Sequence, residues 1–295
     1  MKVLIVGVGS IAKKHISALR KIDRGIDIYA LRSSPNSVKI DGIKDIFDYS
    51  EIDKISPDFF ILSNPTAKHY ETIEKLMLYK LPLFIEKPVF SEVNNKNEQL
   101  INNIERDNII TYVACNLRFL ECLKKTRQIL KNKRINEINI YCGSYLPEWR
   151  KDTDYKKGYS ANKEMGGGVH IDLIHEMDYV YWLFGKPNKT TSLFTNNSSL
   201  QITAYDYANY LWKYDHFSIN IILNYYRRIP KREMEILTDK DVYNVNLLEN
   251  SIYKNGEKVY QSDQPIIDTY EAQIRFFIDK VLHKNQKFNE IHEAY

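Results

Sequence analysis

An acid and a base stand close together in the sequence, just after a run of three glycines. Residues 166–168 are all glycine, and the helix predicted after them carries Asp172, His175, Glu176 and Asp178. Asp172 and His175 are three positions apart and would share one helix face. An imidazole can remove a hydroxyl proton near neutral pH, and a carboxylate can orient or charge it. The spacing predicts a general acid–base pair, with Asp178 able to hold the ring tautomer or to cap local backbone.

Two other interpretations of this helix stay open. Asp172 and His175 could form a buried structural pair that performs no chemistry. They could also belong to a metal site, but such a site needs about three or four protein ligands, and fewer than three convincing ones are present. We therefore expect no bound metal.

A lysine follows the strand predicted at 83–85, within Glu86-Lys87-Pro88. Parallel sheets bind their ligands at the carboxyl ends of the strands, which is where this lysine would lie. Its ammonium could donate a hydrogen bond to a substrate oxygen or carry a proton. Most lysines are simply solvated, so this motif alone is a weak signal.

The N-terminus carries the pattern GxGxxA, from Gly7 to Ala12, between a predicted strand and a predicted helix. Gly7 permits a tight turn, and Gly9 lets the backbone approach a pyrophosphate at the positive end of the helix. The small Ala12 lets the helix and the strand pack closely. With Ser10 and Ile11 between them, these residues predict a dinucleotide site.

The end of the second predicted strand indicates which dinucleotide would bind. An NAD site places an acid about 20 residues further on, where it binds the ribose 2′-hydroxyl. Here the strand is followed by Arg32, Ser33 and Ser34, and Asp27 lies too early. Arg32 could pair with a 2′-phosphate, and the two serines could donate hydrogen bonds to it. The sequence favours NADP(H), with NAD(H) possible; a solvated Arg32 is the alternative.

A third group of residues suits a polar, ring-shaped ligand. Tyr145, Trp149 and Arg150 are followed by Tyr155 and Tyr159. Aromatic side chains mixed with charged and hydroxyl groups can cover a sugar ring and bind its hydroxyls. The whole chain is rich in tyrosine, so an irregular tyrosine-rich loop is the plainer interpretation.

The first part of the chain predicts the elements that position the glycine pattern and Lys87. Up to about residue 115, short apolar runs alternate with amphipathic stretches, which is typical of a doubly wound parallel sheet. The predicted strands are 3–6, 26–31, 59–62, 83–85 and 111–114, and the predicted helices are 11–22, 68–79 and 94–106. We therefore expect an α/β chain that begins with a Rossmann domain at 1–117.

From residue 118 onward, longer β-like runs predict an α+β domain that extends to residue 295. The predicted strands are 138–145, 190–196, 202–211, 216–225 and 233–238, and the predicted helices are 120–131, 169–184 and 270–282. Strands without regular helices between them indicate a large open mixed or antiparallel sheet with one face covered. We expect its other face to pair subunits into a homodimer or homotetramer.

Composition excludes several classes of protein. The 295 residues carry a net charge of +4, and no dense basic run indicates nucleic-acid binding. Cys115, Cys122 and Cys142 are an odd set without CxxC spacing, which argues against a disulfide framework or a zinc site and favours the cytoplasm. No stretch approaches about 18 consecutive apolar residues, so we expect no membrane span.

Taken in order, these motifs resemble the Gfo/Idh/MocA oxidoreductase family over nearly the whole chain. The resemblance runs through the glycine pattern, Asn64-Pro65, Glu86-Lys87-Pro88, residues 116–119 and the segment with Asp172 and His175. The short DxxH spacing is similar to a branch associated with bacterial surface-polysaccharide and nonulosonic-acid sugar pathways. The chain also matches that branch at 143–146, 149–150, 154–155, 159–161 and 166–178. Lys151 and His170 depart from it, since proline and an aliphatic residue are usual there.

The resemblance implies hydride transfer between NAD(P) and a hydroxyl or keto carbon of a sugar or nucleotide sugar. It assigns catalysis to Lys87, Asp172 and His175, with either Lys87 or His175 as the proton donor. Motifs and resemblance together predict these residues at the cofactor: Gly7, Gly9, Ser10, Ile11, Ala12, Arg32, Ser33, Ser34, Asn64, Pro65, His69, Glu86, Lys87, Asn116 and Arg118. They predict these at the substrate: Tyr145, Trp149, Arg150, Tyr155, Tyr159, His170, Asp172 and His175.

Three alternative functions remain on the sequence alone. One is a reductase of a non-sugar substrate, such as a tetrapyrrole or an imine. Another is a protein that senses NADP(H) without catalysis, although the intact set of Lys87, Asp172 and His175 argues against it. The third is a structural subunit that holds an enzyme partner through its sheet.

Overall fold

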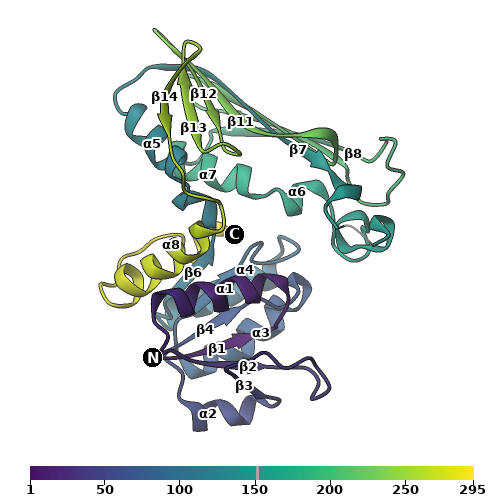
Figure 1. Cartoon of the computed structure of the whole chain (residues 1–295), viewed down its shortest axis with the longest axis vertical. Helices are drawn as coiled ribbons and strands as arrows, with labels where there is room; N and C mark the ends of the chain where they lie inside the picture. The colour runs from purple at the N-terminus through teal and green to yellow at the C-terminus, as the bar shows by residue number, and fades with distance from the viewer. Residues whose placement is uncertain (151–152) are drawn as a thin grey trace. The chain divides into compact units, whose positions relative to one another are not determined.

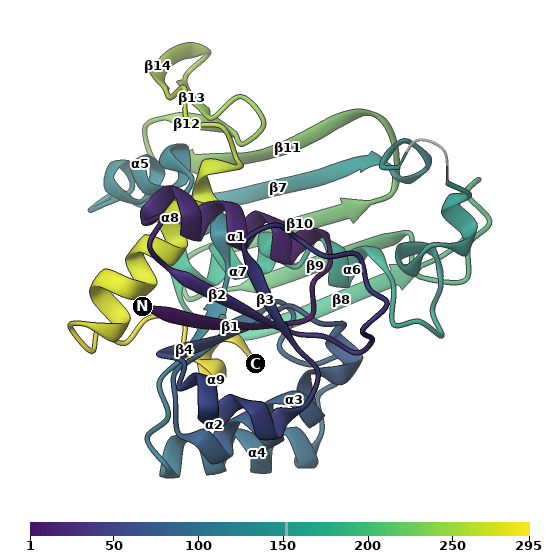
Figure 2. The same ribbon diagram turned by 60° about the horizontal axis from the view of Figure 1, so that its bottom comes forward.

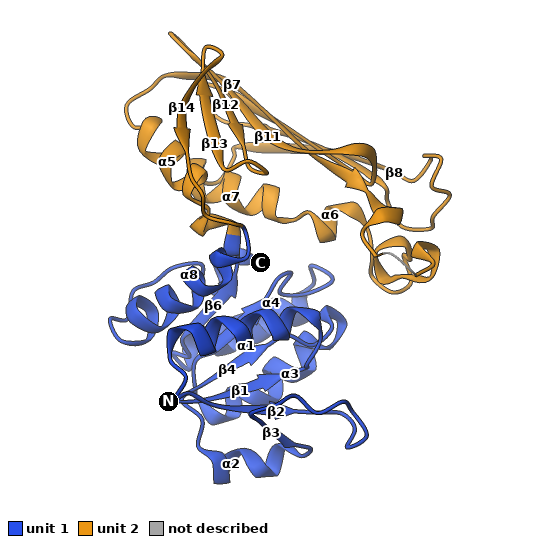
Figure 3. Cartoon of the chain, viewed as in Figure 1, with its two compact units in different colours: residues 1–116, 266–295 blue, residues 117–265 orange. Residues whose placement is uncertain are grey.

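The computed structural model describes residues 1–150 and 153–295, which form two compact units (Figures 1 and 3). The first unit contains residues 1–116 and 266–295, and the second contains residues 117–265. The predicted division assigned everything after residue 117 to the second domain. The structure differs for the C-terminal segment, which returns to the first unit. None of the helices in the described ranges has the length and apolar character that a bilayer crossing requires.

A parallel six-stranded sheet forms the centre of the first unit. Its strands are β1 (Lys2–Val6), β2 (Asp27–Leu31), β3 (Ile43–Ile46), β4 (Phe59–Leu62), β5 (Leu83–Glu86) and β6 (Thr111–Ala114). Their order is β3-β2-β1-β4-β5-β6, and every neighbouring pair is parallel. All four residues of β4, β5 and β6 are buried, as expected for strands covered on both faces. The predicted doubly wound parallel sheet is confirmed.

Helices cover both faces of this sheet (Figures 1 and 2). On one side α1 (Ser10–Ile22) lies beside α8 (Asp268–Phe276), and on the other are α2 (Ile52–Ile55), α3 (His69–Leu76) and α4 (Asn95–Arg106). After α8 the chain continues as a π-helix, Phe277–Leu282, and ends with α9, Ile291–Ala294. The ring of Phe277 packs edge-on against Phe59 and Phe84, at centroid distances of 5.1 and 5.3 Å. This apolar contact anchors the C-terminal segment in the core of the first unit.

An eight-stranded mixed sheet forms the second unit. Its strands are β7 (Ile135–Tyr145), β8 (Lys189–Thr195), β9 (Tyr207–Lys213), β10 (Ser218–Asn224), β11 (Tyr226–Thr238), β12 (Val242–Asn246), β13 (Ser251–Lys254) and β14 (Glu257–Gln261). Their order is β14-β13-β12-β11-β7-β10-β9-β8. Within this sheet, only the β7–β10 pair is parallel among the described strands. The mixed sheet is as predicted, but the sequence reading missed β12, β13 and β14.

Helices cover one face of this second sheet. They are α5 (Glu121–Ile129), α6 (Val169–Asp172) and α7 (His175–Phe184), and Figures 1 and 2 show them along the same side. Along β7, Ile138 and Ile140 are buried, whereas Asn139 and Tyr141 are half-buried. The alternation places the buried side chains under the helices. In the described part of the chain no helix lies over the opposite face, which we call the open face.

Several predicted boundaries are wrong. The helix predicted at 169–184 is two helices, interrupted at Leu173 and Ile174. The strand predicted at 202–211 starts only at Tyr207. Short 3-10 helices occupy Tyr49–Glu51, Thr66–Lys68, Met77–Tyr79, Asn116–Phe119, Leu146–Glu148, Tyr155–Lys157 and Tyr159–Ala161. The last two belong to the loop between β7 and α6 and contain Tyr155 and Tyr159, two of the predicted substrate residues.

Candidate active site

The glycine pattern forms the turn between β1 and α1. Gly7 has a φ of +83°, and a Cβ at this residue would lie 2.5 Å from Cα of Asn64. A side chain there would clash with backbone, so only glycine fits. Gly9 is different, since a Cβ built on it would have no heavy atom within 4 Å. The backbone at Gly9 therefore faces open space, as the approach of a pyrophosphate would require.

The N-terminus of α1 completes an anion site in the first unit. Gly9 is the N-cap, no side chain caps the helix, and its first turn contains no acid. The helix dipole and the first backbone N–H groups therefore favour an anion here. Ala12 is fully buried against the sheet, while Ser10 is exposed and Ile11 half-buried. Among the described residues the side-chain oxygen of Asn64 has no hydrogen-bond partner. These features fit the diphosphate of a dinucleotide.

The residues predicted to select NADP(H) are partly engaged elsewhere. The Arg32 guanidinium donates to Asp45 Oδ1 at 3.4 Å and to the Val38 carbonyl at 2.8 Å, and its side chain is only 8% exposed. Asp45 lies on β3, a strand that the sequence reading missed. Ser33 is exposed, and Ser34 Oγ accepts a hydrogen bond from the backbone of Asn36. The carboxylate beside Arg32 works against a second anion at this place.

Lys87 stands at the carboxyl end of β5, where the backbone is fixed by a buried pair. Glu86 Oε1 lies 2.6 Å from Nε2 of His15, which is fully buried on α1. The other oxygen, Oε2, accepts from the backbone N–H of Lys87 at 3.2 Å. Sequence reasoning missed His15; its signal was a polar residue on the apolar side of an amphipathic helix. Glu86 therefore positions Lys87, which is itself half-buried.

His69 does not reach the surface where a cofactor would bind. It is 1% exposed, with Nδ1 2.9 Å from the Val89 carbonyl and Nε2 3.1 Å from the Asn64 carbonyl. Burial lowers the pKa of its imidazole. His69 was predicted at the cofactor, and its ring links the backbone at Asn64 to that at Val89. Pro65 is exposed, as a contact residue would be.

Asn116 and Arg118 are also buried and committed to other residues. Asn116 Nδ2 donates to Thr269 Oγ1 at 2.7 Å within the first unit. Arg118 is 3% exposed and binds Asp178 through Nη2 at 2.7 Å and Nε at 3.1 Å. Both were predicted at the cofactor, and in the described structure their side chains contact Thr269 and Asp178. Asp178, which was expected to hold the His175 tautomer or cap backbone, pairs with Arg118.

The carboxylate of Asp172 is held by a tyrosine from the sheet. The hydroxyl of Tyr225, which is fully buried at the end of β10, donates to Asp172 Oδ2 at 2.5 Å. Burial, together with the charge of Asp172, raises the pKa of the Tyr225 phenol, so it stays a proton donor in this bond. The two partners are 53 positions apart in the sequence, so sequence reasoning could not detect this contact. One oxygen of Asp172 is therefore fixed in direction.

His175 begins α7, and α7 is fastened to the second unit by two ion pairs. Glu176 is fully buried and accepts from Arg232 Nε at 2.6 Å and Nη2 at 3.1 Å. Asp178 pairs with Arg118, as described above. The continuous helix predicted through Asp172 and His175 is interrupted between them. The residues are instead the last of α6 and the first of α7.

Aromatic side chains lie near Asp172 in the second unit. Trp149 is 40% exposed, its Nε1 donates to Ser144 Oγ, and its ring meets that of Tyr225 edge-on at 5.3 Å. Tyr159 donates to the Gly166 carbonyl at 2.8 Å. These contacts bring two of the predicted substrate residues to the Asp172–Tyr225 pair or to the glycine run before it.

The remaining predicted substrate residues are more scattered. Tyr155 donates to the Leu200 carbonyl at 3.2 Å, and Arg150 is exposed. Tyr145 lies under the guanidinium of Arg228, 3.8 Å from its ring centre. Lys151, named above for its departure from the branch, lies outside the described residues.

His170 sits in an aromatic setting on α6. Its ring lies 5.3 Å from that of Phe194 and 5.5 Å from that of Tyr205. A Cβ on Gly168 would lie 2.7 Å from its Cε1, so glycine at 168 makes room for the imidazole. Burial lowers the pKa of His170 although Asp172 opposes this, which favours a neutral ring.

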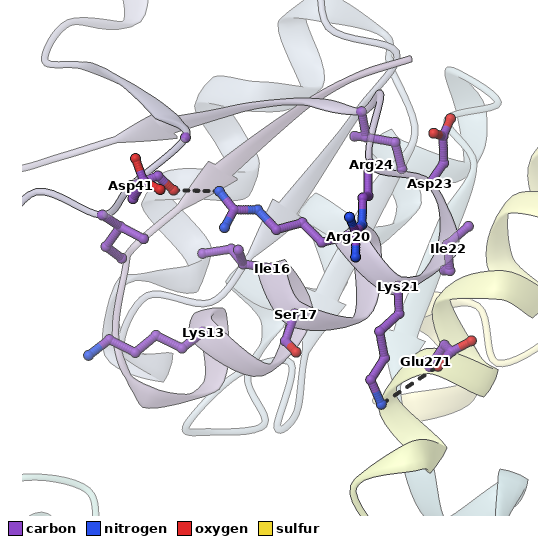
Figure 4. A pocket seen from close by; sticks show the side chains of 13 residues that line it. Lys13, Ile16, Ser17, Arg20, Lys21, Ile22, Asp23, Arg24, Asp41 and Glu271 are labelled. Atoms are coloured by element: carbon purple, nitrogen blue, oxygen red, sulfur yellow. Dashed lines mark hydrogen bonds and ion pairs between the residues drawn. The ribbon is translucent and has the colours of Figure 1, made fainter.

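A wide surface hollow on the first unit lies apart from these chemical groups. It has a volume of about 1350 Å³ and lies along α1, with side chains such as Lys13 and Arg20 around it (Figure 4). Arg20 donates to the Asp41 carbonyl, and Lys21 reaches Glu271, as the dashed lines in the figure mark. The residues that line it include neither Gly9 nor Lys87. We assign it no part of the reaction.

Comparison with known families matches both units. Residues 1–113 match the model for the oxidoreductase family with an NAD-binding Rossmann fold, and residues 123–243 match the GFO/IDH/MocA C-terminal domain. The chain belongs to the Gfo/Idh/MocA oxidoreductase family. Its first unit is the NAD-binding Rossmann fold of that family, and the resemblance seen in the motifs is confirmed.

Relatives of this Gfo/Idh/MocA chain are distant in sequence and close in fold. The uncharacterized oxidoreductase YrbE of Bacillus subtilis is 23% identical over 66% of this chain and 57% of its own length. The chain spans 33 to 57% of the length of the curated relatives it matches. UDP-N-acetylglucosamine 3-dehydrogenase GnnA from Acidithiobacillus ferrooxidans superposes with a TM-score of 0.78 at 16% identity, over 100% of this chain and 93% of that one.

A second solved structure gives a similar result. The WlbA dehydrogenase from Bordetella pertussis, in complex with NADH and UDP-GlcNAcA, has a TM-score of 0.78 at 15% identity, over 99% of this chain and 91% of that one. At such identities the likeness shows the shared fold. In this Gfo/Idh/MocA chain Lys87 falls in the first matched segment, and Asp172 and His175 fall in the second.

Proposed function

We propose that the chain is an NAD(P)-dependent dehydrogenase or reductase that acts on a hydroxyl or keto carbon of a sugar or nucleotide sugar. The observation that carries the proposal is the anchoring of its acid–base groups by buried partners. Glu86 fixes the backbone of Lys87, Tyr225 fixes Asp172, and an ion pair at Glu176 fixes the start of α7 beside His175. A sensing protein without chemistry would gain nothing from such precise support of reactive groups.

Each group has a proposed role in the reaction. The nicotinamide, when bound, accepts or supplies the hydride. His175 takes the proton of the substrate hydroxyl, and Lys87 donates a hydrogen bond to the same oxygen and stabilises its developing charge. Asp172, held by Tyr225, orients one of these partners. In the reverse direction the same groups return the proton, and either Lys87 or His175 is the donor.

The preference between NADP(H) and NAD(H) depends on whether Arg32 pairs with Asp45 or with a 2′-phosphate. The predicted preference for NADP(H) relies on Arg32, Ser33 and Ser34 at the end of β2. A 2′-phosphate must draw the Arg32 guanidinium away from Asp45, which then stands as a like charge beside it. We therefore propose that both dinucleotides bind and that NADP(H) has only a small advantage.

The proposed substrate class is supported by the aromatic setting of Asp172. Trp149 offers an exposed ring face that can cover a sugar, close to Tyr225. Two structural neighbours, GnnA and WlbA, are named for or bound to UDP-linked sugars, which favours a nucleotide sugar over a free one.

We also propose that the open face of the second sheet joins two or four copies of the chain. Leu193 and Leu211 lie on this face and are 60% and 49% exposed. Ala208 and Trp212 of the same sheet point to the opposite, helix-covered face and are buried. Large apolar side chains on an uncovered sheet face indicate a contact surface. Light scattering on the purified chain measures this directly, and a monomer at all concentrations would contradict it.

The test of function follows the absorbance of reduced nicotinamide with a panel of nucleotide sugars and free sugars. Lys87→Ala and His175→Ala are compared with Lys68→Ala, which removes an exposed lysine from the same unit as Lys87. We expect the first two to lose at least about 100-fold in kcat, the usual contribution of a general acid or base, and the third to match the wild type. Near-normal turnover of either catalytic variant, with an unchanged circular dichroism spectrum, would reject the assignment.

A further inference from the structure

A long irregularity in β11 brings several cations to one end of the open face. Tyr226 pairs with Tyr145 of β7, and Lys231 pairs with Gly143. Between these pairs β11 advances by five residues while β7 advances by two (231 − 226 against 145 − 143). Three extra residues therefore bulge out of the ladder, and the sequence from residue 227 to 232 reads Arg-Arg-Ile-Pro-Lys-Arg. A bulge of this kind re-aims the side chains beside it.

Two arginines of this bulge lie over tyrosine rings of β7. The Arg227 guanidinium is 5.0 Å from the centre of the Tyr141 ring, and that of Arg228 is 3.8 Å from the centre of the Tyr145 ring. Guanidinium groups stack on aromatic faces, which restricts their rotamers while leaving their N–H edges directed outward. The rings thus hold the two guanidinium groups in place for an anionic acceptor.

The charges of these arginines are not compensated within the described residues. Lys231 has a carboxylate partner, Glu233, at 2.9 Å. Neither Arg227 nor Arg228 forms an ion pair in the described part of the chain, and Nε of Arg227 is buried there without a hydrogen-bond acceptor. A buried donor without an acceptor is costly, by about 1–3 kcal/mol or more when charged, so it indicates a missing partner.

We propose that Arg227 and Arg228, resting on Tyr141 and Tyr145, bind the phosphate or diphosphate group of a small ligand. Two forks of N–H donors on consecutive residues can share the several oxygens of a phosphate or diphosphate, whereas a carboxylate offers only two oxygens. All four residues belong to the second unit, whereas the glycine turn at Gly9 belongs to the first. The site is therefore additional to the dinucleotide turn, and it does not depend on hydride transfer.

The test is calorimetric titration of the full chain with inorganic pyrophosphate, UDP and uridine, with and without saturating NADH. The NADH arm keeps the glycine turn filled, so that only the second anion site is measured. We expect saturable binding of pyrophosphate and UDP, no binding of uridine, and a loss of about tenfold or more in affinity for Arg228→Ala. Arg228→Lys keeps the positive charge but lacks the two-pronged guanidinium. Its affinity should therefore lie between those of the wild type and Arg228→Ala.

Lys213→Ala is the matched control, because Lys213 is an exposed cation on the same face of the sheet. Its affinity for pyrophosphate should equal that of the wild type. Circular dichroism and light scattering on each variant separate a binding defect from misfolding or a changed assembly. The proposal is overturned if the wild type binds neither pyrophosphate nor UDP, or if Arg228→Ala binds them unchanged. An equal loss of affinity in Lys213→Ala would also overturn the proposal, because the overall positive charge of the face would then explain the binding.

Discussion

The bond between Tyr225 and Asp172 gives the sharpest single prediction. Tyr225→Phe removes one hydroxyl, which is fully buried and lies 2.5 Å from Asp172 Oδ2, and leaves the ring against Trp149. The carboxylate then loses the donor that fixes its direction. A hydrogen bond to a charged group contributes about 1.5–3 kcal/mol. If that energy orients Asp172 for the reaction, kcat should fall by about 10- to 100-fold, which corresponds to about 1.4–2.7 kcal/mol.

Tyr179→Phe is a closely matched control for this experiment. Tyr179 is also fully buried in the second unit, and among the described residues its hydroxyl has no hydrogen-bond partner. Removing that hydroxyl takes away no bond, so kcat should stay within about twofold of the wild type and stability should hold or rise slightly. The assay is the initial rate of nicotinamide oxidation or reduction, with thermal unfolding of each variant. Wild-type kcat in Tyr225→Phe, or an equal loss in Tyr179→Phe, would refute the positioning role of Tyr225.

Three further predictions concern the first unit and the α7 anchor. Asp45→Asn should free Arg32 and raise the affinity for NADP(H) relative to NAD(H) by about tenfold, or 1.4 kcal/mol, in fluorescence titrations; an unchanged ratio would show that Arg32 does not meet the 2′-phosphate. Burial lowers the pKa of His69, so the folded state disfavours the proton that the unfolded state binds below about pH 6.5, and stability should decline as the pH falls from 7 to 5. Urea unfolding of His69→Gln should show a flatter pH dependence, and an identical slope would contradict this. Arg232→Met leaves the Glu176 carboxylate buried without its partner and should cost about 3–5 kcal/mol of stability in the same assay; a loss under 1 kcal/mol would mean that the pair is not needed to hold α7.

Local patterns in the sequence were sufficient for five of the six strands of the first sheet, all but β3, and for its glycine turn. Strands such as Phe59–Leu62 are short, wholly apolar and bounded by turns, so burial on both faces could be predicted from composition alone. The turn at Gly7 and Gly9 was also predictable, because glycine is the residue type that a tight turn and a close backbone approach require. By contrast β12 to β14 are short strands that contain polar residues such as Asn244 and Lys258, and their alternation is too weak to recognise.

The parts of the candidate site that escaped prediction are pairs formed over long separations. His15 meets Glu86 across 71 residues, Tyr225 meets Asp172 across 53, and Arg118 meets Asp178 across 60. Helical and strand periodicities relate residues only a few positions apart, so they cannot pair residues at such sequence separations. A residue such as Arg118 could be recognised as important, but its partner could not be predicted. The return of residues 266–295 to the first unit is of the same kind, because it depends on how Phe277 fits a core formed by distant strands.

The central claim is that Lys87 and His175 act on one reaction, and a double-mutant cycle in kcat/KM tests it most directly. The variants are Lys87→Ala, His175→Ala and the double substitution, measured with the best substrate of the panel. Groups that serve the same step are strongly non-additive, so the double variant should be about as slow as the slower single variant. Losses that multiply, or single variants that turn over at the wild-type rate, would contradict the account.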